Sequence, residues 1–527
     1  MSTSSMPWSR REFLARVGAL GGSAAVYRMT IALGLLPAVA RAQRPELAPV
    51  KGTRTVAILG AGIAGLTAAY ELGRAGYRCT VLEASHRAGG RNLTLRHGDR
   101  VDELGHPQVC AFDDDPHLYL NAGAARIPTS HTTVLAYCRE LGVELAPFVN
   151  QNPNAWIQDD AMLGGKPLRN HQYADDARGF LAELLAKGVS AHKLDAKLDE
   201  GDAERLIALL DEFGDLDKEH LYRRTATAAV GAGTVEPARL PGVYDFAQLL
   251  QSRAAVRAAF GGGDTSSTTM LEPVGGMDRI IAGFLRKLGD VVKLESRVES
   301  VMLRPDGVDV VYRRNGRSQQ LQADYCLNSI PTHLMAGIPH NLPADYAGAF
   351  SAIQRGKFFK LGLQSRERFW ESEHIYGGIS WSDQDITQIW YPSHGFHSRK
   401  GVLLAAYSWS DERGEKFSNL SPAQRIELAI QQGEKLHPGY RAHIENGVSV
   451  AWHRMNYMLG CAARWTDEVR KQWYARLQAP VGGHYMIGDQ MSEHPSWQEG
   501  AFQSALHAVA DIDVRVRGEG ARPGRHT

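Results

Sequence analysis

The stretch Val56–Ala84, VAILGAGIAGLTAAYELGRAGYRCTVLEA, constrains the fold more than any other part of the 527-residue sequence. The apolar run Thr55–Leu59 predicts a short buried strand, and the apolar spacing of Ile63–Ala75 predicts a helix. Between them lie three glycines in the pattern G-x-G-x-x-G, at Gly60, Gly62 and Gly65. In such a unit the first glycine allows a tight turn, the second lets a pyrophosphate approach the backbone, and the third lets the helix pack on the strand.

An acid follows this turn at the distance that a nucleotide requires. A second predicted strand, Arg78–Leu82, is followed by Glu83, which lies 18 residues after Gly65. A carboxylate there accepts hydrogen bonds from ribose hydroxyls, while the free N–H groups of the helix start face the phosphates. The alternative is a glycine turn without a ligand, but the ordered strand, helix, strand and acid favour a dinucleotide-binding unit.

A second glycine cluster follows Glu83 in the sequence ASHRAGGRNLT, which contains Gly89, Gly90 and Arg91. The planar guanidinium of an arginine suits a pyrophosphate. A surface turn with a solvated arginine has the same sequence pattern. These residues alone leave both interpretations open.

Composition restricts the classes of function. The chain is long enough for two or three domains, and its 43% hydrophobic and 22% charged residues are typical of a globular protein. A formal charge of +1 and the lack of a basic block beyond the N-terminus argue against a nucleic-acid partner. Neither the five scattered cysteines nor the run Asp113–Asp115 has the spacing of a metal site, so we expect no metal.

The N-terminus resembles a twin-arginine export signal. The sequence SRREFL at Ser9–Leu14 precedes an apolar region, and Ala40-Arg41-Ala42 has the small-x-small form of a cleavage site. A membrane anchor is the alternative, but Arg28 interrupts the apolar stretch and a bilayer span needs about 20 apolar residues. We therefore expect a signal at residues 1–42, the twin-arginine translocation machinery as a partner, a periplasmic or secreted protein, and no stable membrane span.

Several segments together resemble the flavin amine oxidase family. They are Glu83 with the GGR at Gly89–Arg91, LEPVGGMDRI, RVESVML, ADYCLNSIP, and YMIGDQMSEHPSWQEGAFQSALHAV near the C-terminus. The last has Asp489 where the family usually has glutamate, and Gln498-Glu499 where isoleucine with a small residue is commoner. The resemblance implies FAD as the cofactor, bound by Gly60, Gly62, Ala64, Gly65, Glu83, Gly90, Arg91, Ala125, Arg126, Val298 and Asp489.

Three further motifs resemble those of L-amino-acid oxidases within that family. YLNAGAARIPTSH implies that Arg126 binds the substrate carboxylate, and IWYPSHGF implies that the hydroxyl of Tyr391 binds it too. FFKLGLQ implies that Lys360 holds a water at the flavin N5 and acts in catalysis. Trp497 is expected to wall the substrate site. The alternatives are a structural ion pair for Arg126, core positions for Tyr391 and Trp497, and a satisfied buried lysine.

The resemblance implies oxidation of an L-amino acid by O2 to a 2-oxo acid, ammonia and hydrogen peroxide. Two other flavoenzymes, an amino-acid 2-monooxygenase and a dehydrogenase with another electron acceptor, stay open as alternatives. An amine oxidase is disfavoured because simple amines lack the carboxylate that Arg126 would bind. An exported flavoprotein without catalysis is the alternative that is not an enzyme.

The expected architecture is α/β, with a doubly wound FAD-binding domain, a mixed-sheet substrate domain and a helical insertion. The FAD-binding domain takes segments 53–97, 266–335 and 460–515, and the substrate domain takes 98–155 and 336–455. The insertion, at 156–260, has helical periodicity in RGFLAELLAKG and AERLIALLDEFGDL. We expect the tail after Asp513 to be disordered, and the sequence leaves the oligomeric state open, a homodimer included.

Overall fold

A computed structural model describes residues 44–50, 53–191, 199–224, 242–261, 267 and 269–520. The expected signal at residues 1–42 lies outside these ranges, as do parts of the helical insertion. Within them, no helix combines the length and the apolar character needed to span a bilayer. The described residues from Leu47 onward belong to one compact unit.

A five-stranded parallel sheet forms the centre of the cofactor half. Its order is β11 (Val292–Lys293), β2 (Arg78–Leu82), β1 (Thr55–Leu59), β15 (Tyr325–Asn328) and β23 (His484–Met486). Side chains alternate across a strand. Val56 and Ile58 accordingly join one core cluster and Ala57 and Leu59 another.

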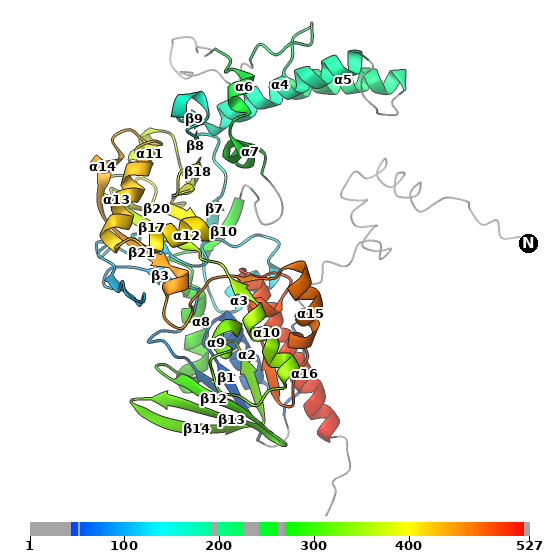
Figure 1. Ribbon diagram of the computed structural model, residues 1–527, viewed down its shortest axis with the longest axis vertical. Coiled ribbons are helices and arrows are strands. Elements are labelled where there is room, and N and C mark those ends of the chain that lie inside the picture. Colours follow the sequence, from blue (N-terminus) through cyan, green and yellow to red (C-terminus); the bar gives the residue numbers. More distant parts are fainter. Residues whose placement is uncertain are drawn as a thin grey trace, which may run out of the picture. The chain divides into compact units, whose positions relative to one another are not determined.

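Different layers cover the two faces of this sheet. The Val56 face packs against helices α2 (Ile63–Arg74), α3 (Thr132–Glu140), α8 (Asp278–Leu288) and α16 (Gln498–Gly520). The other face packs against an antiparallel sheet and helices, namely β12 (Arg297–Arg304), β13 (Gly307–Arg314), β14 (Arg317–Ala323), α9 (Thr332–Met335), α10 (Ala344–Ala352) and α15 (Asp467–Gln478). Figure 1 shows the antiparallel strands beside β1, with α2 and α16 among the helices of this half. The expected doubly wound α/β fold is confirmed.

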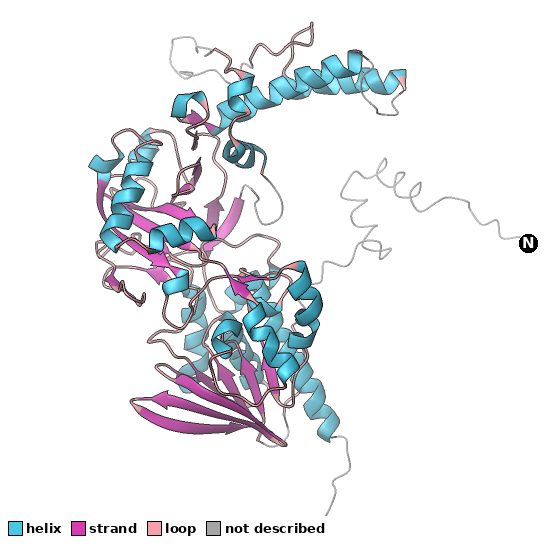
Figure 2. Ribbon diagram, in the orientation of Figure 1, coloured by secondary structure: helices cyan, strands magenta, loops and turns pink. Residues whose placement is uncertain are grey.

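A seven-stranded mixed sheet forms the other half (Figure 2). Its order is β21 (Ile444–Ala451), β17 (Phe359–Ser365), β20 (Gly401–Ser408), β19 (Gln388–Tyr391), β18 (Gly378–Ser382), β8 (Trp156–Gln158) and β9 (Leu168–Arg169). One face packs against helices α11 (Phe369–Ser372), α12 (Asp411–Ser418), α13 (Pro422–Gly433) and α14 (Tyr440–His443). The opposite face carries Trp390, Leu404 and Val450.

Short strand pairs join the long elements. They are β3 (Thr94–Leu95) with β6 (Leu120–Asn121), β4 (Arg100–Val101) with β5 (Gln108–Val109), β7 (Leu145–Val149) with β10 (Thr269–Pro273), and β16 (Gln354–Arg355) with β22 (Ala463–Arg464). β10 falls in a segment expected for the cofactor domain, yet it pairs with β7 of the substrate segment.

The expected start of the helical insertion at residue 156 is wrong. β8 pairs with β18 and β9 pairs with β8, so residues 156–169 extend the substrate sheet. The helices that follow are α4 (Asn170–Ser190), α5 (Glu200–Gly214), α6 (Phe246–Leu249) and α7 (Arg253–Phe260). α4 and α5 pack through a small apolar cluster that includes Ala182, Ala186 and Leu210.

The expected disorder after Asp513 is wrong for residues 514–520, because α16 continues to Gly520, and residues 521–527 lie outside the described ranges. Asp513 is buried and accepts a hydrogen bond from Arg517 Nε at 2.7 Å, one turn further along the helix. Arg515 Nη1 donates to the Tyr485 hydroxyl at 2.7 Å. These contacts extend the helix over residues whose composition alone suggested a tail.

Candidate active site

One cavity of about 1160 Å³ has walls from both the cofactor half and the substrate sheet. Sites for drug-sized ligands typically measure about 300–1,000 Å³. This cavity therefore has room for an extended dinucleotide and a second small molecule. Of the cofactor-binding residues expected from the sequence, all but Gly65 line it: Gly60, Gly62, Ala64, Glu83, Gly90, Arg91, Ala125, Arg126, Val298 and Asp489.

A different local geometry explains why glycine occupies each of the three positions in the turn. Gly60 has a φ of +98°, which residues with a side chain rarely adopt. A Cβ on Gly65 would lie 2.0 Å from the Gly60 carbonyl oxygen, so only glycine lets α2 start this close to β1. A Cβ on Gly62 would meet nothing within 4 Å, because that position opens into the cavity. The open space at Gly62 is what a closely bound phosphate needs.

Glu83 closes the turn through its carboxylate. Oε2 accepts a hydrogen bond from the Ala61 N–H at 2.8 Å, and Oε1 accepts one from the Ser85 N–H at 2.9 Å. Burial raises the pKa of Glu83, and these backbone N–H groups oppose that rise. A carboxylate has about four acceptor sites, so two stay available for ribose hydroxyls.

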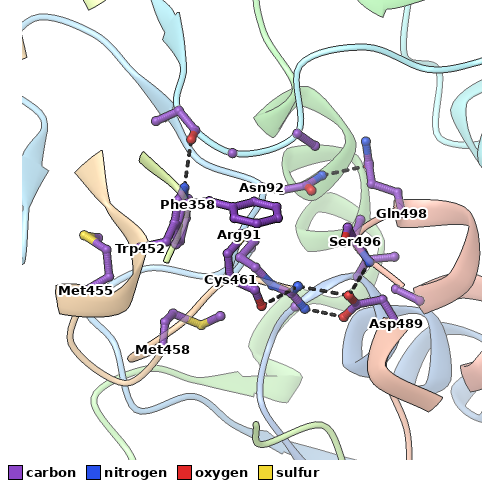
Figure 3. A pocket seen from close by; sticks show the side chains of 18 of the residues that line it. Arg91, Asn92, Phe358, Trp452, Met455, Met458, Cys461, Asp489, Ser496 and Gln498 are labelled. Carbon is purple, nitrogen blue, oxygen red and sulfur yellow. Dashed lines mark hydrogen bonds and ion pairs between the residues drawn. The ribbon is translucent and has the colours of Figure 1, made fainter. Parts of the chain in front are cut away.

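Arg91, which is partly buried, and the buried Asp489 form an ion pair at the cavity wall (Figure 3). Arg91 Nη1 donates to Asp489 Oδ2 at 2.9 Å and to the Cys461 carbonyl at 3.1 Å, and the Ser496 N–H donates to Asp489 Oδ2 at 2.9 Å. Burial lowers the pKa of Arg91, but the Asp489 charge outweighs burial and holds it above its usual value. The charge of Arg91 is therefore balanced within the protein.

Arg126 carries a charge that no carboxylate balances among the residues that the structure describes. Its Nη1 donates to Asn150 Oδ1 at 2.8 Å, and its guanidinium carbon lies 4.6 Å from the centre of the Trp390 ring. Burial lowers the pKa of Arg126. A guanidinium that faces a cavity without an ionic partner is suited to bind an anion.

Lys360 lies on the cavity face of β17 and is 4% exposed. Its Nζ donates to the carbonyl oxygens of Gly123 at 2.6 Å and Asn121 at 3.1 Å, and lies 4.7 Å from the centre of the Tyr407 ring. Burial, and then the charge of Arg126, lower the pKa of Lys360 to about 7. Lys360 thus lines the cavity, and the catalytic role that its motif implied stays a prediction.

The predicted role of Tyr391 is wrong. Its hydroxyl lies 2.7 Å from Ser380 Oγ and 2.6 Å from His437 Nε2, and its ring belongs to the core on the helix-covered face of the substrate sheet. Tyr391 does not line the cavity. The reason is strand alternation: its neighbour Trp390 faces the cavity, so Tyr391 faces the core.

A different tyrosine, Tyr407, lies beside Arg126 and Lys360. It pairs with Lys360 across β17 and β20, and it lines the cavity. Burial raises the pKa of Tyr407, and the charge of Arg126 opposes that rise. On a strand with regular alternation, Tyr407 would face the same side as Leu403, which faces the core. The sequence pattern therefore did not identify Tyr407 as a cavity residue. A β-bulge at Ala405, where the pairing with β17 shifts, reverses the alternation and turns Tyr407 into the cavity.

Aromatic side chains complete the substrate half of the cavity. Trp497 lines it and lies edge-on to His131, with ring centres 5.0 Å apart. Trp390 packs edge-on against Tyr407 at 5.3 Å, and Trp381 against Trp409 at 6.2 Å. Across the described ranges, no three His, Cys, Asp or Glu side chains gather in a group that would hold a metal ion.

The model of the family described as flavin containing amine oxidoreductase matches residues 63–513. The chain belongs to the flavin-containing amine oxidoreductase family. Its cofactor is FAD. The glycine turn, Glu83 and Val298 fit this group, since they line one cavity with an open backbone position at Gly62.

Curated relatives of this family cover nearly the whole chain. It is 28% identical over 474 residues to an L-amino-acid oxidase of Siganus canaliculatus, covering 88% of this chain and 85% of the relative. It is 26% identical to an L-amino-acid oxidase of Gloydius halys, with 89% and 91% covered. It is also 26% identical to the flavin-dependent L-tryptophan oxidase RebO of Lentzea aerocolonigenes, with 88% and 99% covered.

Solved structures agree on the fold. Putrescine oxidase bound to putrescine superposes with a TM-score of 0.58 at 18% identity, covering 89% of this chain and 99% of that one. Cyclohexylamine oxidase from Brevibacterium oxydans has a TM-score of 0.58 at 16% identity, covering 91% and 100%. At these identities the likeness concerns the fold alone.

Proposed function

We propose that this flavin-dependent amine oxidoreductase is an L-amino-acid oxidase. The observation that carries the proposal is the unbalanced guanidinium of Arg126 in the cavity. The substrate carboxylate would pair with it and accept a further hydrogen bond from the hydroxyl of Tyr407. That hydroxyl has no partner among the residues that the structure describes. Hydrogen bonds to charged groups contribute about 1.5–3 kcal/mol each, so these two contacts would fix the carboxylate end of the substrate.

The electrostatics of the cavity favour an amino acid over a simple amine. Arg126 and Lys360 lie together on the substrate side, and the charge of one lowers the pKa of the other. A simple ammonium ion would add a third positive charge there. An amino acid brings a carboxylate that neutralises Arg126, and its α-carbon would then be held in a fixed orientation.

FAD held by the glycine turn, Glu83 and Val298 would supply the redox chemistry that the side chains lack, the oxidation of the substrate α-carbon by loss of a hydride, with O2 as the final electron acceptor and hydrogen peroxide as its product. Arg126 and Tyr407 hold the carboxylate during that step, and the aromatic walls exclude bulk water. The amine must be neutral when the hydride leaves. Lys360, whose pKa is about 7, would hold or exchange a proton near the reacting atoms. The imino acid then hydrolyses to a 2-oxo acid and ammonia.

Product analysis tests the proposal. With each of the twenty L-amino acids and O2, we expect equal amounts of 2-oxo acid, ammonia and hydrogen peroxide from the accepted substrates. An amide with one carbon fewer, and carbon dioxide, would instead indicate a 2-monooxygenase. Flavin reduction without oxygen consumption would indicate a dehydrogenase. A flavin that no amino acid reduces under anaerobic conditions would indicate a flavoprotein without this catalysis.

We also propose that the protein is exported through the twin-arginine pathway, on the strength of Arg10 and Arg11 ahead of the apolar segment. That pathway carries folded proteins and so suits a chain that binds FAD first. The double substitution Arg10→Lys with Arg11→Lys should leave FAD-loaded enzyme in the cytoplasm, as cell fractionation would show. Export of this variant at the wild-type level would contradict the proposal.

A further inference from the structure

Another arginine without a carboxylate partner among the described residues, Arg355, lines the same cavity. It lies on β16, and no sequence motif pointed to it. Its Nη2 donates to Thr332 Oγ1 at 3.2 Å and to the side-chain oxygen of Gln490. Its Nε is buried and has no hydrogen-bond partner. All of its hydrogen-bond partners are neutral.

The charge near Arg355 does not balance. Among the described residues, no carboxylate oxygen lies within 4.0 Å of its guanidinium, and the neighbouring acid, Asp489, is paired with Arg91. The guanidinium groups of Arg91 and Arg355 therefore both interact with the single carboxylate of Asp489. Burial, and then the charge of Arg91, lower the pKa of Arg355 to about 10. Arg355 is partly buried, and an unpaired charge in such a position is unfavourable, so a cation kept there is suited to an anionic ligand.

The surroundings hold this arginine in place. Gln490 is 2% exposed, and its Oε1 also accepts a hydrogen bond from the Thr332 N–H at 3.2 Å. Its Nε2 donates to the carbonyl oxygens of Ile330 at 3.1 Å and Ile487 at 3.2 Å. Arg355 itself is paired with Ala463 in the β16–β22 ladder. A cation fixed in this way loses little conformational entropy when a ligand binds.

We propose that Arg355 is a cofactor-binding residue whose charge pairs with negative charge on FAD. The sequence pattern had given this task to Arg91. The structure pairs Arg91 with Asp489 and leaves Arg355, like Arg87 and Arg126, facing the cavity without a carboxylate within 4.0 Å among the described residues. The negative charge on FAD has two sources, the diphosphate and the flavin ring, which gains negative charge when reduced. The inference rests on the family's cofactor, and it holds whichever amine or amino acid is the substrate.

The test compares Arg355→Gln, which removes the charge, with Arg355→Lys, which keeps it. The holoproteins are stripped of FAD, and FAD and riboflavin are titrated back separately at low and high salt. The reduction potential of the reloaded flavin is measured with redox dyes. Arg476→Gln is the matched control, since it removes one positive charge from an exposed pair with Asp345 outside the cavity.

If Arg355 faces the diphosphate, Arg355→Gln should raise the Kd of FAD about tenfold or more, leave the Kd of riboflavin unchanged, and reduce the salt dependence of FAD binding. If it faces the ring, Arg355→Gln should lower the reduction potential while the Kd of oxidised FAD stays near wild type. Arg355→Lys should restore most of either effect, and Arg476→Gln should show neither.

The proposal is overturned if Arg355→Gln binds FAD with wild-type affinity, salt dependence and reduction potential. It is equally overturned if Arg355→Lys is as impaired as Arg355→Gln, because the loss would then come from shape and not from charge. If Arg355→Gln fails to fold, the Lys variant and the salt dependence of FAD binding by the wild-type protein still test the proposal. A Kd for FAD and a reduction potential that both stay unchanged with salt in the wild-type and Lys proteins would contradict a role for charge.

Discussion

At the scale of single residues, we assign the hydroxyl of Tyr391 a structural role and the hydroxyl of Tyr407 a role in substrate binding. Tyr391→Phe removes one hydrogen bond from Ser380 Oγ, which keeps the Trp156 N–H, and one from His437 Nε2, so we expect a loss of about 1–2 kcal/mol in unfolding free energy with unchanged kinetics. Tyr407→Phe should raise the KM for the amino acid about tenfold and leave stability unchanged. Denaturant unfolding and steady-state kinetics of both variants would check this, and an unchanged KM for Tyr407→Phe would exclude it from the substrate site.

Lys360 should make stability depend on pH. Its pKa is about 7 in the folded protein, against a usual value of 10.5, so between these pH values the unfolded chain binds a proton that the folded chain lacks. Stability therefore rises with pH across this window, by up to about 1.4 kcal/mol per pH unit. Lys360→Met should remove that rise. Unfolding free energies of the apoproteins at pH 7 to 10 would show it, and parallel curves for the two proteins would contradict the assigned pKa.

At the scale of elements, substitutions of Gly62 and Gly65 test FAD binding and the packing of α2 on β1 separately. A Cβ on Gly65 would meet the Gly60 carbonyl at 2.0 Å, so Gly65→Ala should destabilise the apoprotein by about 1–3 kcal/mol. A Cβ on Gly62 meets no protein atom within 4 Å, so Gly62→Ala should fold with wild-type stability and bind FAD poorly. Melting temperatures with and without FAD test the pair, and normal FAD binding by Gly62→Ala would contradict the assigned phosphate position.

Elements also show where sequence reasoning succeeds and where it ends. The strand, glycine turn, helix and Glu83 are adjacent in the chain, so local spacing predicted them. Arg126 and Lys360 both line the cavity, and the roles that their short motifs implied stay predictions. Tyr407 could not be found in this way, because the bulge at Ala405 reverses the side-chain alternation of β20. A bulge is determined by pairing with a strand far away in sequence, which a local pattern does not contain.

At the scale of the whole molecule, order along the chain predicted the parallel sheet but not the boundaries between parts. Residues 156–169 were assigned to the insertion because helical periodicity follows them, yet β8 and β9 complete the substrate sheet. Likewise, Asp489 and Arg355 lie far from Arg91 in the chain and close to it in the fold. The distribution of charge in the cavity is thus a tertiary property. The sequence motifs identified Arg91, Arg126 and Lys360, but neither Arg355 nor the pairing of Arg91 with Asp489.

The central claim is that Arg126 binds the substrate carboxylate, and anaerobic flavin reduction tests it most directly. Wild-type enzyme is mixed with the best L-amino acid and, separately, with the amine that lacks only its carboxylate, while flavin absorbance is followed. We predict that the amino acid reduces the flavin at least about a hundredfold faster, and that Arg126→Gln removes most of this preference by slowing the amino acid alone. An equal preference in the variant, or wild-type enzyme that prefers the amine, would contradict the claim.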